Sequence, residues 1–353
     1  MRLPGNSTIP SQTSGDSVSD TAQPTKAAAI QFEGVPGDVA ENMRRLDAMI
    51  AEAADKGAKL IGVPEFATSP LPFRSEVHRS VLPPKNAAVD MFNAAAKRYG
   101  CHIGGSMLIA EGDNIYNRYH LFEPDGTTHL HDKDLPTMWE NAFYGPGNDD
   151  GAFETSLGRM GAAVCWELIR NQTARRLVGR VDVVMTGTHW WTTPNNWGGL
   201  VDRMFGPLSQ YNRYLSENAP TEFARRVGAP VLQASHCGQF RTDFMLLPGT
   251  SMTAPYDTNY VGATQIVDAE GNILASRNTA EGAGIVFADI MIGAQQPTET
   301  IEGTFWMPRL PLALRAYWHH QNICAKRYYR RTGRRVGLDA AAGNRVGSVE
   351  VVR

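Results

Sequence analysis

The sequence predicts an α/β domain in which strands and helices alternate along the chain. Short apolar runs of strand length recur between residues 27 and 290, and segments with helical spacing of apolar residues separate several of them. With 353 residues, 42% of them hydrophobic, the chain can bury a large core. Because the alternation is continuous, we expect one catalytic domain over 26–292. It would lie between a disordered N-terminal tail at 1–25 and a C-terminal extension at 293–353.

The first predicted helix has recognisable signals at both ends. Asp38 and Glu41 form a capping-box pattern with aspartate as the cap, and Gly57 ends the run. Between them, apolar side chains recur at helical spacing at Val39, Met43, Leu46, Ile50 and Ala54. A buried strand over 59–65 follows directly and ends at a glutamate.

The later elements continue the alternation. We expect helices over 86–99 and 166–179, the second closed by a glycine. We expect strands over 102–109, 120–122, 127–131, 160–164, 181–186 and 230–235.

Composition and charge exclude several classes of protein. The net charge of −2 indicates no preference for nucleic acids or membranes. The first 25 residues are polar and lack the apolar core of a signal peptide. No apolar run has the length that crosses a membrane. We therefore expect a soluble, cytoplasmic protein.

The four cysteines are widely spaced and form no Cys-x-x-Cys pair, so neither a zinc site nor a disulfide framework is expected. Cys165 alone lies between the end of a predicted strand and the start of a predicted helix. A helix dipole there would favour the thiolate, and free backbone N–H groups could hold an oxyanion. Cys165 is thus a candidate nucleophile; the alternative is a buried structural cysteine.

Two charged residues also end predicted strands. Glu65 follows a buried apolar run, and a glutamate there either reaches solvent or is paired. Lys133 follows the strand over 127–131 and begins a loop rich in proline, glycine and aromatic residues. Its alternative interpretation is a solvated cation.

Together, the three segments resemble the nitrilase or carbon–nitrogen hydrolase superfamily. The matching residues are Glu65 in Val-Pro-Glu-Phe, Lys133 in His-Asp-Lys-Asp-Leu-Pro-Thr and Cys165 in Val-Cys-Trp-Glu. Glu140, seven residues after Lys133, matches a second glutamate of that superfamily. The resemblance spans about 27–290 and includes similar closing strands.

The resemblance implies a fold and a mechanism. The fold would be an α-β-β-α sandwich of two sheets, and members of the superfamily pair as dimers. Cys165 would attack as the nucleophile and Glu65 would act as general base. Lys133, with the backbone N–H of Trp166, would stabilise the developing negative charge. This chemistry needs no metal and no organic cofactor.

Other residues have weaker assignments. Glu140 would orient the substrate amine or Lys133, or it is a surface carboxylate of the loop. The aromatic residues His189, Trp190 and Trp191 line the substrate pocket or belong to the core. Glu167 is interpreted as a carboxylate at a helix start, stabilised by the helix dipole.

The expected activity is hydrolysis of a nitrile or amide to a carboxylic acid and ammonia or an amine through a cysteine thioester. Cys-Trp-Glu favours the nitrilase branch, but Leu168, Ile169 and Arg170 depart from its usual continuation. An amidase or an N-carbamoyl amidohydrolase therefore stays open, as does an inactive scaffold protein. The expected partners are a small-molecule substrate and further copies of the chain. We expect a homodimer or larger homo-oligomer, with contacts at 315–329.

Overall fold

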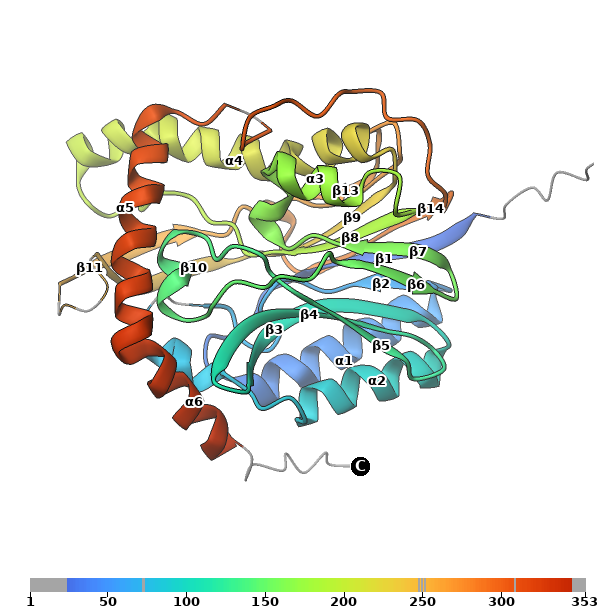
Figure 1. The fold of residues 1–353 in the computed structure, drawn as a ribbon, viewed down its shortest axis with the longest axis horizontal. Helices are drawn as coiled ribbons and strands as arrows, with labels where there is room; N and C mark the ends of the chain where they lie inside the picture. Colours follow the sequence, from blue (N-terminus) through green and yellow to red (C-terminus); the bar gives the residue numbers. More distant parts are fainter. Residues whose placement is uncertain are drawn as a thin grey trace, which may run out of the picture.

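Two β-sheets lie face to face between two pairs of helices in the computed structural model of the chain (Figure 1). The structure describes residues 24–344 except 72, 73, 247, 249, 251 and 308. The predicted N-terminal tail lies outside the described residues up to position 23. The four layers confirm the α-β-β-α sandwich that the sequence resemblance implied.

The first sheet is built around a parallel centre. Its strands, from one edge to the other, are β14 (Gly284–Ile290), β1 (Thr25–Phe32), β2 (Leu60–Gly62), β3 (His102–Glu111), β4 (Asn114–Phe122) and β5 (Thr128–Asp132). Strands β1, β2 and β3 are parallel, and the outer pairings are antiparallel. The parallel strands β1 and β2 are almost completely buried, as expected for strands covered on both faces.

The second sheet has a similar plan and joins the first at one seam. Its strands are, in order, β6 (Ala152–Thr155), β7 (Gly158–Ala162), β8 (Val183–Thr188), β9 (Val231–His236), β12 (Thr264–Val267) and β13 (Ile273–Arg277). The seam is a short parallel pairing of β1 with β9, where Gln31 faces Ser235 and Phe32 faces His236. Elsewhere the two sheets meet through their side chains.

Each sheet has its own pair of helices. Helices α1 (Val39–Asp55) and α2 (Ala87–Tyr99) cover the first sheet, and α3 (Asn171–Leu177) and α4 (Gly199–Val227) cover the second (Figure 1). The predicted start of α1 is confirmed, because the Asp38 carboxylate accepts a hydrogen bond from the Glu41 N–H at 3.0 Å. Asn86 caps α2 by accepting from two N–H groups.

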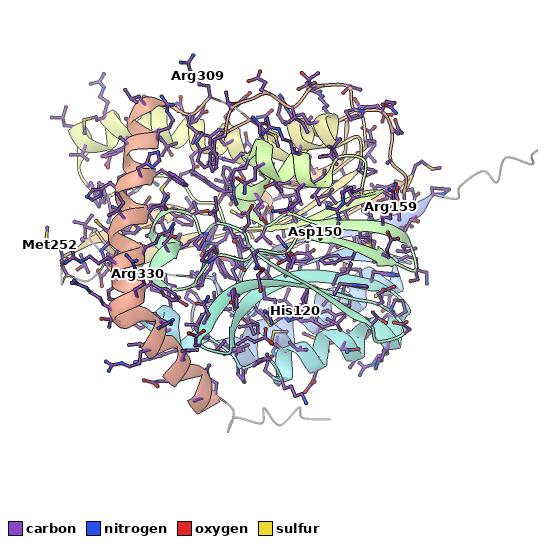
Figure 2. All side chains as sticks on the ribbon, viewed as in Figure 1. His120, Asp150, Arg159, Met252, Arg309 and Arg330 are labelled. Carbon is purple, nitrogen blue, oxygen red and sulfur yellow. The ribbon has the colours of Figure 1, made fainter. Side chains whose placement is uncertain are left out.

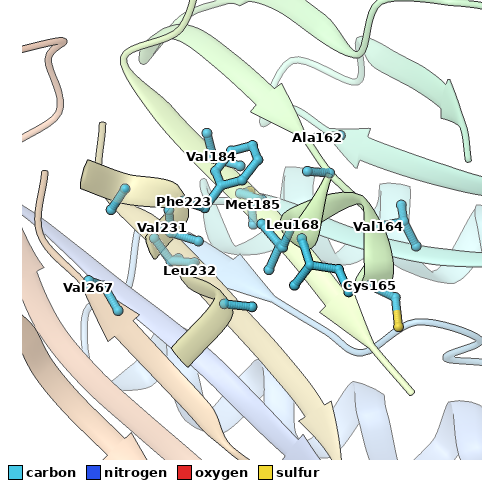
Figure 3. Packing of buried hydrophobic residues seen from close by; sticks show 14 of the residues in the cluster. Ala162, Val164, Cys165, Leu168, Val184, Met185, Phe223, Val231, Leu232 and Val267 are labelled. Atoms are coloured by element: carbon cyan, nitrogen blue, oxygen red, sulfur yellow. The ribbon is translucent and has the colours of Figure 1, made fainter. Parts of the chain in front are cut away.

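The core between α4 and the second sheet leads directly to the predicted nucleophile. Phe223 of α4 packs with strand residues such as Val184, Met185 and Leu232, and all are buried (Figure 3). Cys165 lies at the margin of this cluster, with its sulfur beyond the apolar side chains that the figure labels. The apolar packing therefore holds the backbone of this turn rigidly.

The prediction of one helix over 166–179 is wrong. A five-residue 3-10 helix, η3 (Cys165–Ile169), is followed by an extended residue at Arg170, and only then by α3. The cause lies far away in the sequence. The N–H of Asn171 donates to the carbonyl of Phe305, and the N–H of Met307 donates to the carbonyl of Ile169. These backbone hydrogen bonds replace the helical ones.

The C-terminal segment crosses the end of the sandwich where the site lies. Helix α5 (Leu312–Tyr328), a π-helical turn η5 (Tyr329–Gly333) and α6 (Arg334–Gly343) run along this end, beside the hairpin of β10 (Gln239–Met245) and β11 (Thr253–Asn259) (Figure 1). Asn141 donates to Asn322 at 2.8 Å, so α5 is tied to this chain's own domain. Arg309, before α5, projects outward, whereas His120 lies inside (Figure 2).

The helices that the structure describes include none long and apolar enough to cross a membrane. The remaining short 3-10 helices are η1 (Ser75–Ser80), η2 (Met138–Ala142) and η4 (Thr279–Glu281).

Candidate active site

Backbone strain marks the site before any side chain is considered. Among the described residues, four that are not glycine have a positive φ, and three of them accompany the predicted site residues. Phe66 directly follows Glu65, Met138 lies two residues before Glu140, and the third is Cys165 itself with φ of 56°. Such conformations cost about 1–3 kcal/mol each and concentrate at functional sites. Local strain therefore supports a site at this position.

Glu65 lies three residues beyond the end of β2 and is completely buried. Its Oε1 accepts hydrogen bonds from Asn117 Nδ2 and from Lys133 Nζ, both at 2.8 Å. Its Oε2 has no hydrogen-bond partner in the described part of the chain, and the neighbouring Cys165 thiol contributes to lowering the Glu65 pKa. One carboxylate oxygen is thus fixed and the other is free to take a proton.

A close approach of two backbones holds Glu65 in place. A Cβ at Gly187 of β8 would lie 2.3 Å from the backbone nitrogen of Glu65, so only glycine fits there. His236 binds the Glu65 carbonyl oxygen through Nε2 at 2.7 Å. The second sheet therefore supports the backbone that carries Glu65.

Lys133 joins the two glutamates. Its Nζ donates to Glu65 at 2.8 Å and to Glu140 Oε2 at 2.9 Å, and the residue is completely buried. The interpretation of Lys133 as a solvated cation is therefore wrong. Burial by itself would lower its pKa, but the carboxylates of Glu140 and Glu65 raise the pKa well above its usual value. Lys133 is consequently an ammonium at every physiological pH.

Glu140 is buried as well, so its interpretation as a surface carboxylate is wrong. It lies in η2, and the N–H of Thr137 donates to its Oε2 at 2.7 Å. The Tyr144 hydroxyl donates to the same oxygen. Sequence reasoning missed Asn117 and Tyr144, because Asn117 lies inside β4 rather than at a strand end and Tyr144 is one of several aromatic residues in the loop after Lys133.

The Cys165 thiol has a raised pKa in this setting. Desolvation is the largest cause and the Glu65 carboxylate adds to it, while Lys133 and a hydrogen bond from the His189 backbone oppose the rise. The expectation that a helix dipole favours the thiolate is therefore wrong, because the helix after Cys165 is only a short 3-10 turn. The resting group is a neutral thiol beside a carboxylate.

Burial also sets the state of the candidate base. It raises the pKa of Glu65 to about 7, with Lys133 opposing the rise and Glu140 adding to it. Glu65 is therefore divided between its acid and carboxylate forms near neutral pH.

The aromatic residues predicted to line the pocket have separate surroundings. His189 binds the N–H of Leu71 and the hydroxyl of Tyr260 through Nε2. Trp190 packs against Trp166 with ring centroids 5.6 Å apart. Trp191 contacts the ring of Trp139, the residue before Glu140, at 5.4 Å.

A cavity among the described residues lies beside the site rather than in it. It has a volume of about 640 Å³, and its walls include Trp306, Trp318 and Arg315. A smaller recess shares Trp306 and Trp318 with this cavity and reaches Trp166, the neighbour of Cys165. The described residues contain no cluster of three or more side chains suited to a metal ion, and all four cysteines are free.

Comparison with known proteins gives one family. A family model described as carbon–nitrogen hydrolase matches residues 26–299. The omega-amidase NIT2 of Danio rerio is 31% identical over 142 residues, 36% of this chain and 50% of that enzyme. The chain thus spans about half the length of this relative. The bifunctional nitrilase/nitrile hydratase NIT4B of Nicotiana tabacum is 24% identical over 301 residues, 78% of this chain and 80% of that enzyme.

Solved structures share the fold. A carbon–nitrogen hydrolase from Helicobacter pylori G27 has a TM-score of 0.59 at 17% identity, covering 77% of this chain and 90% of that one. The amidase from Nesterenkonia sp. AN1, with acrylamide added to its active-site cysteine, has a TM-score of 0.56 at 17% identity. It covers 75% of this chain and 92% of that one.

The buried ammonium gives a stability prediction. Lys133→Met would leave two buried carboxylates without their cation, and breaking a buried ion pair in this way costs about 3–5 kcal/mol. We expect urea denaturation to show a loss of that size. The control is Lys56→Met, which removes an ion pair with Glu52 on the surface of α1 and should cost at most about 1 kcal/mol. Equal stability losses in the two variants would contradict the buried role of Lys133.

Proposed function

The chain belongs to the carbon–nitrogen hydrolase family, and we propose that it hydrolyses a nitrile or an amide through a thioester on Cys165. The observation that carries this proposal is the buried cluster in which the Lys133 ammonium bridges Glu65 and Glu140 beside a thiol. Nothing in the packing of a scaffold protein would require two carboxylates, an ammonium and a thiol in one desolvated position. Such a cluster is costly to bury and is suited to chemistry.

Glu65 is the proposed general base. The carboxylate with its pKa of about 7 is strong enough to accept the thiol proton and weak enough to return it. Because the thiol is neutral at rest, the proton moves to Glu65 as the sulfur attacks the substrate carbon. The fixed hydrogen bonds on Oε1 leave Oε2 to receive it.

Lys133 and the backbone N–H of Trp166 are the proposed stabilisers of developing negative charge. The ammonium is fixed by two carboxylates, so it needs no reorganisation when charge appears on the substrate. The N–H of Trp166 lies in the first turn of η3, where helical N–H groups have no partner in their own helix. The proposed pocket role of His189, Trp190 and Trp191 remains a prediction.

Glu140 is proposed to position Lys133 and to hold the leaving nitrogen. Three donors converge on Oε2, from Lys133, Thr137 and Tyr144. This leaves Oε1 as the atom available to a substrate N–H. Glu65 contacts the thiol and accepts its proton, whereas Glu140 positions Lys133 and the leaving nitrogen. The two carboxylates therefore have different proposed roles.

The reaction balances without a cofactor. With an amide, the sulfur adds to the carbonyl carbon and the thiol proton passes through Glu65 to the nitrogen. The carbon–nitrogen bond then breaks, ammonia or an amine departs, and a thioester remains on Cys165. Water then attacks the thioester, gives its proton to Glu65, and releases the acid and the thiol. With a nitrile, the sulfur first adds to form a thioimidate, one water converts it to the thioester with loss of ammonia, and a second water releases the acid.

We favour a nitrile over an amide as the substrate. The match to the tobacco nitrilase/nitrile hydratase covers 80% of that enzyme, whereas the match to the Danio rerio omega-amidase covers half of it. An amide or an N-carbamoyl compound is the alternative, because the same groups serve both reactions.

A substrate screen tests the function. We expect ammonia release from at least one member of a panel that pairs each nitrile with its primary amide and its N-carbamoyl analogue. Cys165→Ala should abolish this release and leave folding intact, since it removes the thiol beside Glu65. Mass spectrometry should detect an acyl adduct on Cys165 in the active protein. Ammonia release by folded Cys165→Ala at the normal rate would refute the thioester.

The pH dependence tests the base. Because Glu65 must be ionised to accept a proton, kcat/KM should fall about tenfold for each pH unit below about 7. Unfolding does not explain such a fall. The pKa of Glu65 in the folded protein lies above its ordinary value of 4.5, so the stability that Glu65 contributes is complete below pH 4.5 and is lost as the pH rises through about 7. A flat profile between pH 5.5 and 8 would exclude Glu65 as the base.

We also propose that the chain forms a homodimer or larger homo-oligomer. Large apolar side chains are exposed on neighbouring helices: Leu312 and Ile323 on α5 are 73% and 70% exposed, and Leu200 on α4 is 83% exposed. Covering such side chains with a second copy would remove apolar surface from water. Light scattering at micromolar concentration should give at least twice the mass of one chain. Leu312→Lys with Ile323→Lys should weaken the assembly, and a wild-type monomer would contradict it.

A further inference from the structure

A second buried carboxylate, Glu167, lies two residues after Cys165 and outside the cluster described above. It is completely buried, and its two oxygens have matching partners. Each oxygen accepts one backbone N–H and binds one cationic side chain. The sequence-based interpretation, a helix-start carboxylate stabilised by a dipole, does not account for this arrangement.

The Oε2 atom of Glu167 contacts the backbone next to the Cys165 thiol. The N–H of Val164, the residue before Cys165, donates to Oε2 at 2.6 Å, and His131 binds the same oxygen through Nε2 at 2.9 Å. Asp149 holds the other nitrogen of His131. The two carboxylates raise the pKa of His131 to about 10 against the effect of burial, so His131 is an imidazolium at neutral pH.

The Oε1 atom of Glu167 contacts the backbone next to Lys133. The N–H of Asp134, the residue after Lys133, donates to Oε1 at 3.2 Å, and Arg176 binds it at 3.3 Å. Glu167 thus contacts the backbone immediately next to both Cys165 and Lys133.

These two backbones belong to different sheets. Lys133 follows β5, the edge of the first sheet, and Cys165 follows β7 of the second. The backbone seam between the sheets, β1 with β9, lies several strands away. Within the described residues no strand pairing joins β5 to β7, whereas the Glu167 carboxylate accepts backbone N–H groups next to both Lys133 and Cys165.

We propose that Glu167 is a positioning residue that fixes the Cys165 thiol against the Lys133 ammonium by joining the two sheets. The proposal rests on the proposed function, in which these two groups act on one substrate carbon. It also explains how Cys165 keeps a positive φ, since the Glu167 carboxylate holds the N–H of Val164 directly before it.

Glu167→Gln is the first variant to test. A glutamine has one acceptor oxygen and places an NH2 group where the second oxygen stood, so one backbone N–H would face a donor. The two sheet ends would then separate slightly. Since a misplacement of about 1 Å costs about 100-fold in rate, we expect kcat to fall about 100-fold in the folded variant.

A second readout separates positioning from structural support. Lys133 lowers the pKa of the Cys165 thiol, so moving it away should raise that pKa. We expect the pH profile of Cys165 alkylation by iodoacetamide to shift to higher pH in Glu167→Gln. Peptide mass spectrometry must locate the adduct, because Cys324 is partly exposed whereas Cys165 is buried. Glu167→Asp keeps the charge, but its side chain is too short to reach both N–H groups. Its kcat and its alkylation profile should therefore lie between those of the wild type and those of Glu167→Gln.

The matched control is Glu123→Gln. Glu123 is also buried, binds His102 and His129, and accepts from the N–H of Ser156 between β6 and β7. It joins the same two sheets but has no contact with the cluster. Glu123→Gln should lose comparable stability in urea and keep wild-type kcat and the wild-type alkylation profile.

The outcomes are distinct. If Glu167→Gln loses stability like Glu123→Gln but keeps its kcat and its alkylation profile, Glu167 is merely structural and the proposal is overturned. If Glu167→Gln does not fold, the kcat and the alkylation profile of Glu167→Asp test the proposal by the same criterion. If the wild type releases no ammonia from any substrate, the proposed function fails, and the alkylation profiles still test the positioning.

Discussion

The site depends on one physical constraint, the burial of the Lys133 ammonium. A buried cation is tolerated only with compensating anions, and Glu65 and Glu140 supply them at 2.8 and 2.9 Å. The same two contacts fix the position of the ammonium, which places the Glu65 carboxylate beside the Cys165 thiol. Most other features of the site follow from holding these four side chains together: the Tyr144 and Asn117 hydrogen bonds, the glycine at 187 and the strained turns.

The surrounding packing stabilises a local geometry that would not persist alone. Positive φ values at Phe66, Met138 and Cys165 are each unfavourable, and they occur where a strand end must turn sharply toward the cluster. The apolar core behind Cys165 and the close contact of Gly187 with Glu65 hold these turns. Stability is therefore concentrated in the sheets and helices, while the strain is concentrated in the site that they carry.

The sequence predicted those parts of the fold and site that local signals specify. Strand-end positions identified Glu65, Lys133 and Cys165, and a capping-box pattern located the start of α1. Long-range contacts explain the failures. The helix predicted over 166–179 is interrupted by backbone pairing with residues 305–307. Helix α4 contains Pro207 and Pro220, which argue against a helix locally, and packing against the second sheet overrides them. The contacts of Asn117 with Glu65 and of Tyr144 with Glu140 could be identified only from the structure.

Charge balance separates the part of the site that reacts from the part that holds it. Around Glu167, three cations (His131, Arg170 and Arg176) face three carboxylates (Glu167, Asp134 and Asp149). Burial and the Glu167 carboxylate raise the pKa of Asp134 to about 6, and above that pH the network carries equal positive and negative charge. Beside the thiol, one ammonium faces two carboxylates. Burial raises the pKa of Glu65 toward neutrality, and the Glu140 carboxylate adds to this rise while Lys133 opposes it. The proton that the reaction moves therefore belongs to the unbalanced cluster, and the balanced network keeps its geometry fixed while the proton moves.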